Sequence, residues 1–92
     1  MKITLLSKPG FSGNMLVRKI EEVAKSQLMD IEVFLNVHLQ EADVVLLTPQ
    51  RSEDLKEIKK VVKVPVGVTS LKDYGLLDGS SIIKYAKQLI QK

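Results

Sequence analysis

Short apolar runs alternate along the chain with longer stretches in which apolar residues recur at helical spacing. Four of the runs are rich in Val, Ile and Leu and have the length of β-strands. They cover residues 2–6, 31–35, 43–47 and 65–68. The third contains Val44-Val45-Leu46-Leu47 without interruption, which is typical of a strand buried on both faces of a parallel sheet.

Three stretches have the spacing of amphipathic helices. The first, residues 13–28, places on one face Leu16, Ile20, Val23 and Ala24. The second follows Thr48-Pro49 and is expected to bury Leu55, Ile58, Val61 and Val62. The last helix, capped by Asp78 or Ser80, is expected to pack through Ile82, Ile83, Ala86, Leu89 and Ile90. With a short helical turn near 71–74, the predicted order is β-α-β-β-α-β-α.

This order predicts an α/β domain in which helices cover both faces of a mostly parallel sheet. Only seven residues, 36–42, separate the second and third strands, whereas a parallel crossover needs about a dozen or more. The two strands are therefore either antiparallel neighbours or separated by another strand. We favour the second arrangement, a four-stranded sheet of order 2-1-3-4 in a single domain that comprises residues 1–92.

The composition excludes several classes of protein. With 45% hydrophobic residues and a net charge of only +3, the chain is not disordered. Its longest apolar run is far shorter than the roughly 20 residues of a membrane span. The absence of cysteine excludes disulfides and thiolate metal sites, and no segment has the pattern of a signal peptide. We therefore expect a cytoplasmic protein without a metal, a cofactor or direct membrane insertion.

The charge is unevenly distributed, since residues 1–25 carry a net +3 and residues 26–50 a net −4. A nucleic-acid-binding protein would combine a basic cluster with interleaved aromatic residues or glycines. The cluster of Lys56, Lys59, Lys60 and Lys63 contains neither. We interpret it as the exposed face of a helix, and expect small-anion or protein partners and no nucleic acid.

The loop after the first strand is the candidate site. In open α/β sheets, ligands bind beyond the carboxyl ends of the strands, where the strand order reverses. In a 2-1-3-4 sheet this place lies beside the first strand. The loop leads into a helix N-terminus, whose N–H groups and dipole favour an anion. Its residues are Ser7, Lys8, Pro9, Gly10, Phe11, Ser12, Gly13 and Asn14.

Two interpretations of this loop are open on the residues alone. The loop has neither the G-x-x-x-x-G-K-[ST] pattern of nucleotide P-loops nor the G-x-G-x-x-G pattern of dinucleotide sites. It is either a tight strand-to-helix turn, in which Gly10 and Gly13 give backbone freedom and Ser12 caps the helix, or a site that binds a phosphate-like anion.

A family resemblance favours the second interpretation. Residues 42–50, with the sequence ADVVLLTPQ, resemble the A-D-V-V-L-L-x-P-Q stretch of the enzyme IIB component of the lactose/cellobiose class of the bacterial sugar phosphotransferase system. Pro65-Val66, Tyr74-Gly75 and Asp78-Gly79 follow at the family's spacing. The family's C-S-A-G-M-S-T-S-L-L corresponds to residues 7–16. The resemblance implies a four-stranded parallel sheet similar to that of small tyrosine phosphatases.

The resemblance also implies a function. Proteins of this family take a phosphoryl group from a phosphohistidine of the IIA partner, hold it on a cysteine thiol, and pass it to a sugar at the membrane permease IIC. Ser7 stands where the family has this cysteine. A serine hydroxyl stays protonated at neutral pH without an adjacent base, so we expect this phosphotransferase to be inactive as written. Ser7 is either a Cys-to-Ser substitution or the mark of a phosphorylation-dead relative.

The remaining expectations concern the surroundings of Ser7. Lys8, Gly10, Phe11, Ser12, Gly13 and Asn14 are the expected phosphate-binding loop, although Pro9 removes one N–H donor. Gln50, at the end of the third strand, is a candidate rim contact. Phe11 or Met15 is a candidate docking contact for a partner. We interpret His38 as an exposed loop residue. The alternative function is a non-catalytic interaction or regulatory domain on the same fold.

Overall fold

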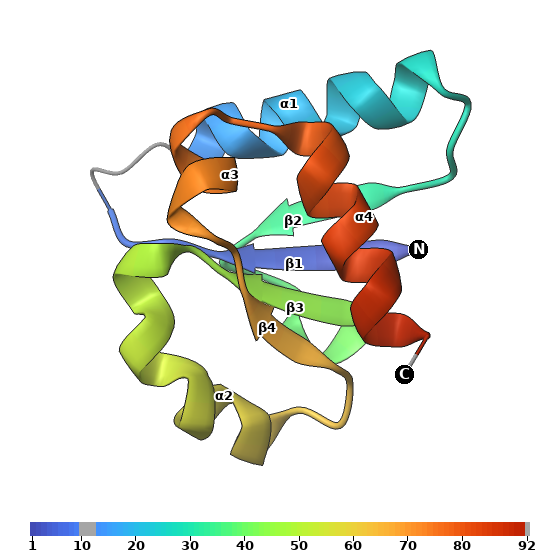
Figure 1. Ribbon diagram of the computed structural model, residues 1–92. Coiled ribbons are helices and arrows are strands. Elements are labelled where there is room, and N and C mark those ends of the chain that lie inside the picture. Colours follow the sequence, from blue (N-terminus) through green and yellow to red (C-terminus); the bar gives the residue numbers. More distant parts are fainter. Residues whose placement is uncertain (10–12, 92) are drawn as a thin grey trace.

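The structure is a computed structural model that describes residues 1–9 and 13–91, and Figure 1 shows how its elements are arranged. Its strands are β1 (Lys2–Leu6), β2 (Glu32–Leu35), β3 (Val44–Leu47) and β4 (Val66–Val68). Its α-helices are α1 (Gly13–Ser26), α2 (Leu55–Val61), α3 (Leu71–Gly75) and α4 (Gly79–Ile90). Two 3-10 helices, η1 (Leu39–Glu41) and η2 (Pro49–Asp54), lie on either side of β3.

The four strands are parallel and form one sheet in the order β2-β1-β3-β4, as expected from the short connection between β2 and β3. Because β1 lies between these two strands, that connection crosses over one strand and passes through η1. In register, Leu5 of β1 pairs with Leu35 of β2 and with Leu46 of β3. All four carboxyl ends therefore lie at one edge of the sheet.

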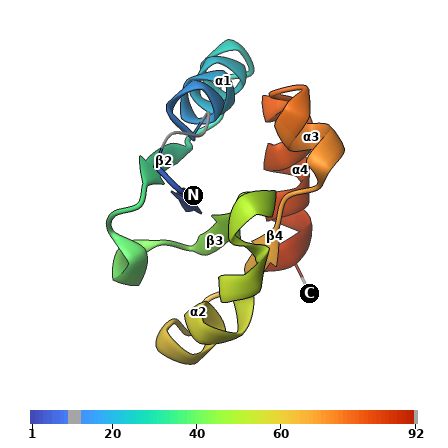
Figure 2. The same ribbon diagram turned by 90° about the vertical axis from the view of Figure 1, so that its left-hand side faces the viewer.

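Each face of the sheet packs against its own helices, because strand side chains alternate between the faces. Ile3, Leu5, Val44 and Leu46 pack in one core with α1 and α4. Leu6, Val45, Leu47 and Val66 pack in a second core with α2. Figure 2 shows α1 and α4 on one side of the sheet and α2 on the other. The predicted α/β architecture with helices on both faces is confirmed.

Several predicted inward positions and boundaries were wrong. The first helix ends at Ser26 instead of residue 28, because Leu28 adopts a left-handed backbone (φ 54°) and is 94% exposed. Val61, expected to be buried, is 56% exposed. It lies about 240° around the helix from Leu55, whereas Ile58 and Val62 fall near the Leu55 face. Ile90, also expected to be buried, is 40% exposed because it belongs to the final turn of α4.

The segment after β3 begins as the 3-10 helix η2 and becomes α-helical only at Leu55. Pro49 occupies the first turn, where its missing N–H costs no hydrogen bond. A kink lies inside η2, where Arg51 has non-helical backbone angles (φ −110°, ψ 15°). Because η2 directly follows β3, its first residues lie at the carboxyl edge of the sheet.

Side-chain caps fix the start of the last two helices. The Ser70 hydroxyl accepts a hydrogen bond from the Asp73 N–H at 3.0 Å and caps α3. Asp78 Oδ1 accepts one from the Ser81 N–H at 3.0 Å, so that Asp78 and not Ser80 caps α4. The hydrogen bonds from the Ser81 backbone and side chain lower the pKa of the Asp78 carboxyl. None of the helices in the described ranges is long and apolar enough to cross a membrane.

Candidate functional site

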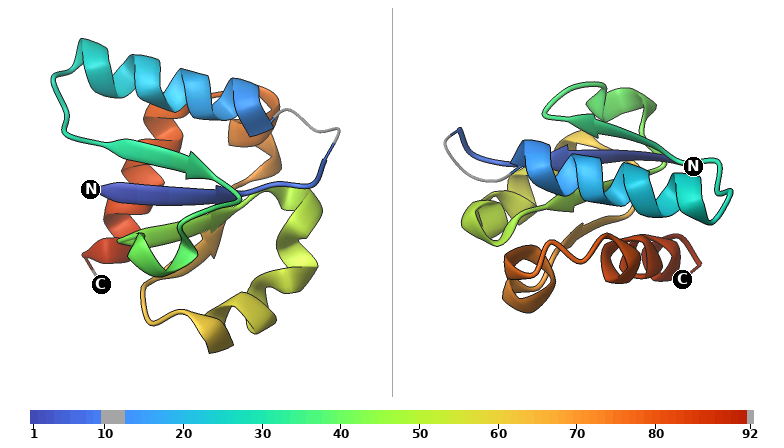
Figure 3. Two further views of the ribbon diagram at one scale, coloured as in Figure 1. Left: turned by 180° about the vertical axis from the view of Figure 1, so that it is seen from behind. Right: turned by 90° about the horizontal axis from the view of Figure 1, so that it is seen from above.

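The candidate site lies at the carboxyl edge of the sheet. The chain leaves β1 at Ser7, β3 at Thr48 and β4 at Thr69, and all three residues are buried. Seen from behind, the end of β1, the start of α1 and the segment η2 lie at this same edge (Figure 3). The sheet therefore places the residue after its inner strand β1 beside the N-terminus of a 14-residue helix.

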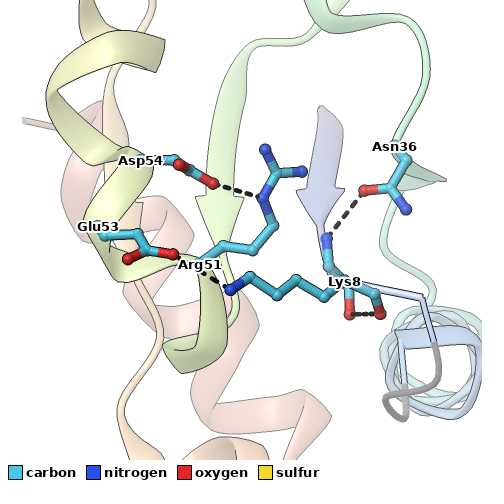
Figure 4. Close-up of polar contacts among 6 residues, drawn as sticks. Lys8, Asn36, Arg51, Glu53 and Asp54 are labelled. Atoms are coloured by element: carbon cyan, nitrogen blue, oxygen red, sulfur yellow. Dashed lines mark hydrogen bonds and ion pairs between the residues drawn. The ribbon is translucent and has the colours of Figure 1, made fainter.

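Ser7 is 4% exposed and held by its backbone. Its N–H donates to Asn36 Oδ1 at 2.8 Å (Figure 4), while its Oγ donates a long bond of 3.4 Å to the Lys8 carbonyl. Asn36 adopts a left-handed backbone (φ 60°) directly after β2, and its own N–H donates to the Leu5 carbonyl at 2.8 Å. Asparagine tolerates this conformation better than most residues. Asn36 can therefore end the edge strand β2 and at the same time hold the Ser7 N–H through its side chain.

Gly13 allows the first turn of α1 to approach Ser7 closely. A Cβ atom added at Gly13 would lie 3.0 Å from Ser7 Cβ, from Ser7 Oγ and from Leu35 Cδ1. Side chains essentially never pack tighter than this distance. The Ser7 hydroxyl therefore lies directly beneath the amino end of α1, where the helix dipole favours negative charge.

The structure places only part of the expected loop. Gly10, Phe11 and Ser12 lie outside the described residues. Lys8 is exposed, and its Nζ forms an ion pair with Glu53 Oε1 of η2 at 3.1 Å (Figure 4). Asn14 is exposed in the first turn of α1, and Met15 beside it is 54% exposed. Ser7, Lys8 and Gly13 are thus brought together at one point.

Gln50 lies in η2 and is half-buried. Its Oε1 is buried and has no hydrogen-bond partner in the part of the chain that the structure describes, and the same is true of the Thr48 hydroxyl. Both groups follow β3 at the carboxyl edge. Both atoms could form hydrogen bonds to a ligand. This is unusual, because most buried polar groups in proteins are already hydrogen-bonded.

Three residues near the site were missed by the sequence analysis: Asn36, Thr48 and Arg51. Arg51 Nε donates to Asp54 Oδ2 at 2.9 Å within η2 (Figure 4), the segment whose Glu53 pairs with Lys8. One signal was available for the first two, because each directly follows a predicted strand and must reach the carboxyl edge in a parallel sheet. The position of Arg51 depends on the kink inside η2, which no sequence pattern indicated.

Other singled-out residues have structural roles in the described part of the chain. His38 has a left-handed backbone (φ 57°), pairs with Glu41 through Nδ1 at 3.2 Å and lies against the Phe34 ring. Tyr74 packs against the core formed with α1 and α4. Among the described residues, no cluster of three or more His, Cys, Asp or Glu side chains could hold a metal ion.

Solved structures with this fold include IIB components. The lactose-specific IIB domain from Streptococcus pneumoniae superposes with a TM-score of 0.82 over 97% of this chain and 96% of its own, at 16% identity. The cellobiose-specific IIB component from Borrelia burgdorferi gives a TM-score of 0.77 over 99% and 92%, at 28% identity. The fold that the resemblance implied is therefore confirmed.

Sequence comparisons agree with the structural ones. The galactose-specific EIIB component of Lactococcus lactis subsp. cremoris and the cellobiose-specific EIIB component of Lactococcus lactis subsp. lactis are each 28% identical. Each alignment covers 96% of this chain and 94% of the relative. The family model described as "PTS system, Lactose/Cellobiose specific IIB subunit" matches residues 2–85. The chain therefore belongs to the lactose/cellobiose-specific IIB subunit family of the phosphotransferase system.

Proposed function

We propose that this chain is the IIB component of a sugar-transporting phosphotransferase system, with Ser7 at the position that carries the phosphoryl group. Residues 1–92 form its single IIB domain, and its partners are a phosphorylated IIA protein and a membrane permease IIC. The observation that carries the proposal is the position of Ser7, buried beneath the amino end of α1 and packed against Gly13. Family membership supports the same assignment.

The chemistry requires a thiolate at position 7. The thiolate attacks the phosphorus of the phosphohistidine, so that an S–P bond forms while the P–N bond breaks and its electron pair returns to the imidazole. In the second step a sugar hydroxyl attacks and gives its proton to water or to a base of the permease; an O–P bond forms while the S–P bond breaks, and its electron pair returns to the thiolate. A helix N-terminus lowers the pKa of a thiol at this place, and the N–H groups of Lys8 and residues 10–14 hold the phosphate oxygens.

With serine at position 7, the chain binds phosphate without carrying the phosphoryl group. The hydrogen bond that Ser7 Oγ makes within the described residues goes to a backbone carbonyl, which is not a base. This observation favours the second candidate function, a non-catalytic interaction or regulatory domain that has lost the transfer step.

The experiment that separates the two functions is Ser7→Cys. Incubation with phosphorylated IIA protein should add one phosphoryl group to the variant, detected by mass spectrometry, and none to the Ser7 chain. Ser26→Cys is the matched control, because it places an exposed thiol at the opposite end of the same helix, where the dipole raises the pKa of a thiol. Transfer to the cysteine at position 7 alone supports the carrier.

An unmodified Ser7→Cys chain that still binds inorganic phosphate would instead support the interaction domain. Phosphate binding is measured by an NMR titration, in which the amide signals of residues 8–14, and that of Gln50, should shift. Shifts confined to the lysine face of 56–63 would contradict the site.

A further inference from the structure

Three hydroxyl side chains form a row across the carboxyl edge of the sheet. Leu6 pairs with Leu47, and Leu47 pairs with Val68, so the next residues of the three strands are neighbours in the order Ser7, Thr48, Thr69. Backbone hydrogen bonds continue the pairing, from the Thr48 N–H to the Leu6 carbonyl at 3.0 Å and from the Thr69 N–H to the Leu47 carbonyl at 2.9 Å.

The side chains of Ser7 and Thr48 lie on the same face of the sheet. Leu46, two residues before Thr48, packs in the core with α1 and α4, while Leu47 packs on the α2 side. Thr48 remains extended (φ −69°, ψ 158°), so the alternation continues and its side chain lies on the α1 side. Ser7 lies on this face too, because its side chain packs against Gly13.

Within the described residues, only the middle hydroxyl of the row has no partner. Ser7 Oγ bonds to the Lys8 carbonyl and Thr69 Oγ1 to the Leu47 carbonyl at 3.2 Å. Thr48 is 0% exposed, and its Oγ1 has no hydrogen-bond partner in residues 1–9 and 13–91. A valine has the same shape and would avoid the cost of burying an unpaired hydroxyl. The fold therefore retains a donor beside Ser7 that contributes nothing to its own hydrogen bonding.

We propose that the Thr48 hydroxyl is a phosphate ligand, which donates a hydrogen bond to an oxygen of the anion held at position 7. This inference rests on the proposed function, because it adds a ligand to the same anion site. Ser7 and Thr48 follow paired residues of adjacent strands and both are buried, so Thr48 is the hydroxyl next to an anion that contacts Ser7. A hydroxyl suits this role, since it is a neutral donor that stays protonated at all physiological pH values.

The test compares four chains for inorganic phosphate affinity, by NMR titration, and for thermal stability without phosphate. Thr48→Val should bind phosphate about tenfold more weakly, as expected for one lost hydrogen bond to a charged group, yet unfold at a higher temperature than the wild type. Thr48→Ser should restore the affinity to within about threefold, because it keeps the donor. Thr69→Val is the matched control, whose hydroxyl is already bonded to a carbonyl, and should lower the Tm without changing the affinity.

A merely structural role for Thr48 predicts a different pattern. Equal phosphate affinity of Thr48→Val and the wild type would overturn the proposal, as would an equal loss in Thr48→Val and Thr48→Ser. If Thr48→Val does not fold, Thr48→Ala provides the same loss of the donor. A wild-type chain whose amide signals do not respond to phosphate would overturn the anion site itself, and with it the role of Thr48.

Discussion

Lys8 is the only basic residue of the expected phosphate loop, residues 7–14. Its side chain forms an ion pair with the carboxylate of Glu53. Its Nζ lies 3.1 Å from Glu53 Oε1, and both side chains are largely exposed. A bound phosphate and the Glu53 carboxylate would compete for the same ammonium group. We therefore expect Glu53 to lower the affinity of the proposed site for anions, while its ion pair with Lys8 connects the residues after β1 to η2.

Removing this competition should strengthen anion binding. Glu53→Gln frees Lys8 and should raise phosphate affinity by about two- to fivefold at low salt, an effect that salt screens. The stability should change by less than about 0.5 kcal/mol, since exposed ion pairs contribute little. Isothermal titration with phosphate at two salt concentrations measures the effect.

The matched control for Glu53→Gln is Glu57→Gln. Glu57 pairs with Lys60 on the exposed surface of α2 at 3.7 Å, and its removal changes the net charge of the chain by the same amount. Equal gains in the two variants would assign the effect to overall charge and contradict a specific role for the pair between Lys8 and Glu53.

The role of Asn36 could not be predicted from the sequence and is evident only in the structure. From the sequence it belonged to a connection of unknown course, and nothing indicated its left-handed backbone or its hydrogen bond to the Ser7 N–H. Because that N–H is already bonded to Asn36, it is not free to bind an anion. The positions of Ser7 and Lys8 directly after the first strand, and of Gly13 at the start of the following helix, could be predicted from the sequence.

At the scale of elements, local pattern and chain length were sufficient for most of the fold. A connection too short for adjacent parallel strands left two strand arrangements, of which the favoured one is confirmed. Residue type left Asp78 or Ser80 as the cap of the last helix, and the structure shows Asp78. The second predicted helix was less accurate, because its first six residues form η2. Apolar content alone placed Val61 inward, although a helix of seven residues presents only a narrow buried face.

The packing of α1 against α4 depends on a glycine. A Cβ atom at Gly79 would lie 2.7 Å from the backbone oxygen of Lys19 in α1, which cannot move without displacing the helix. Gly79→Ala should therefore reduce the free energy of unfolding by about 1–3 kcal/mol, as overpacking does. Urea denaturation followed by circular dichroism measures the change.

Gly75 provides the comparison for Gly79. It lies at the end of α3 and has nothing within 4 Å of an added Cβ atom. Gly75→Ala should leave the stability unchanged or raise it by up to about 1 kcal/mol, because alanine has the higher helix propensity. A similar loss of stability in both variants would contradict the assignment of the effect to the contact between α1 and α4.

At the scale of the whole molecule, the sheet gathers the site and its apolar surroundings at one edge. The start of α1 and the helix α3 both lie at the carboxyl edge of the strands (Figure 1). Their exposed apolar side chains include Met15 and Leu71, and Leu76 follows α3 directly. A protein that delivers a phosphoryl group to position 7 must cover this edge, and apolar side chains near the centre of an interface contribute most to its affinity.

Met15 is an apolar side chain in the first turn of α1, two residues after Gly13, and it is 54% exposed. In a Ser7→Cys background, Met15→Asp should slow phosphoryl transfer from IIA by about tenfold, the effect of losing one central interface contact, while inorganic phosphate affinity falls by less than about threefold. Leu28→Asp is the matched control, because Leu28 is 94% exposed just beyond the opposite end of α1. It introduces the same charge far from the carboxyl edge and should leave the transfer rate unchanged.

Rapid-quench measurements at several IIA concentrations separate the docking of IIA from the transfer step. Equal slowing of transfer in the two variants would exclude Met15 as a docking contact.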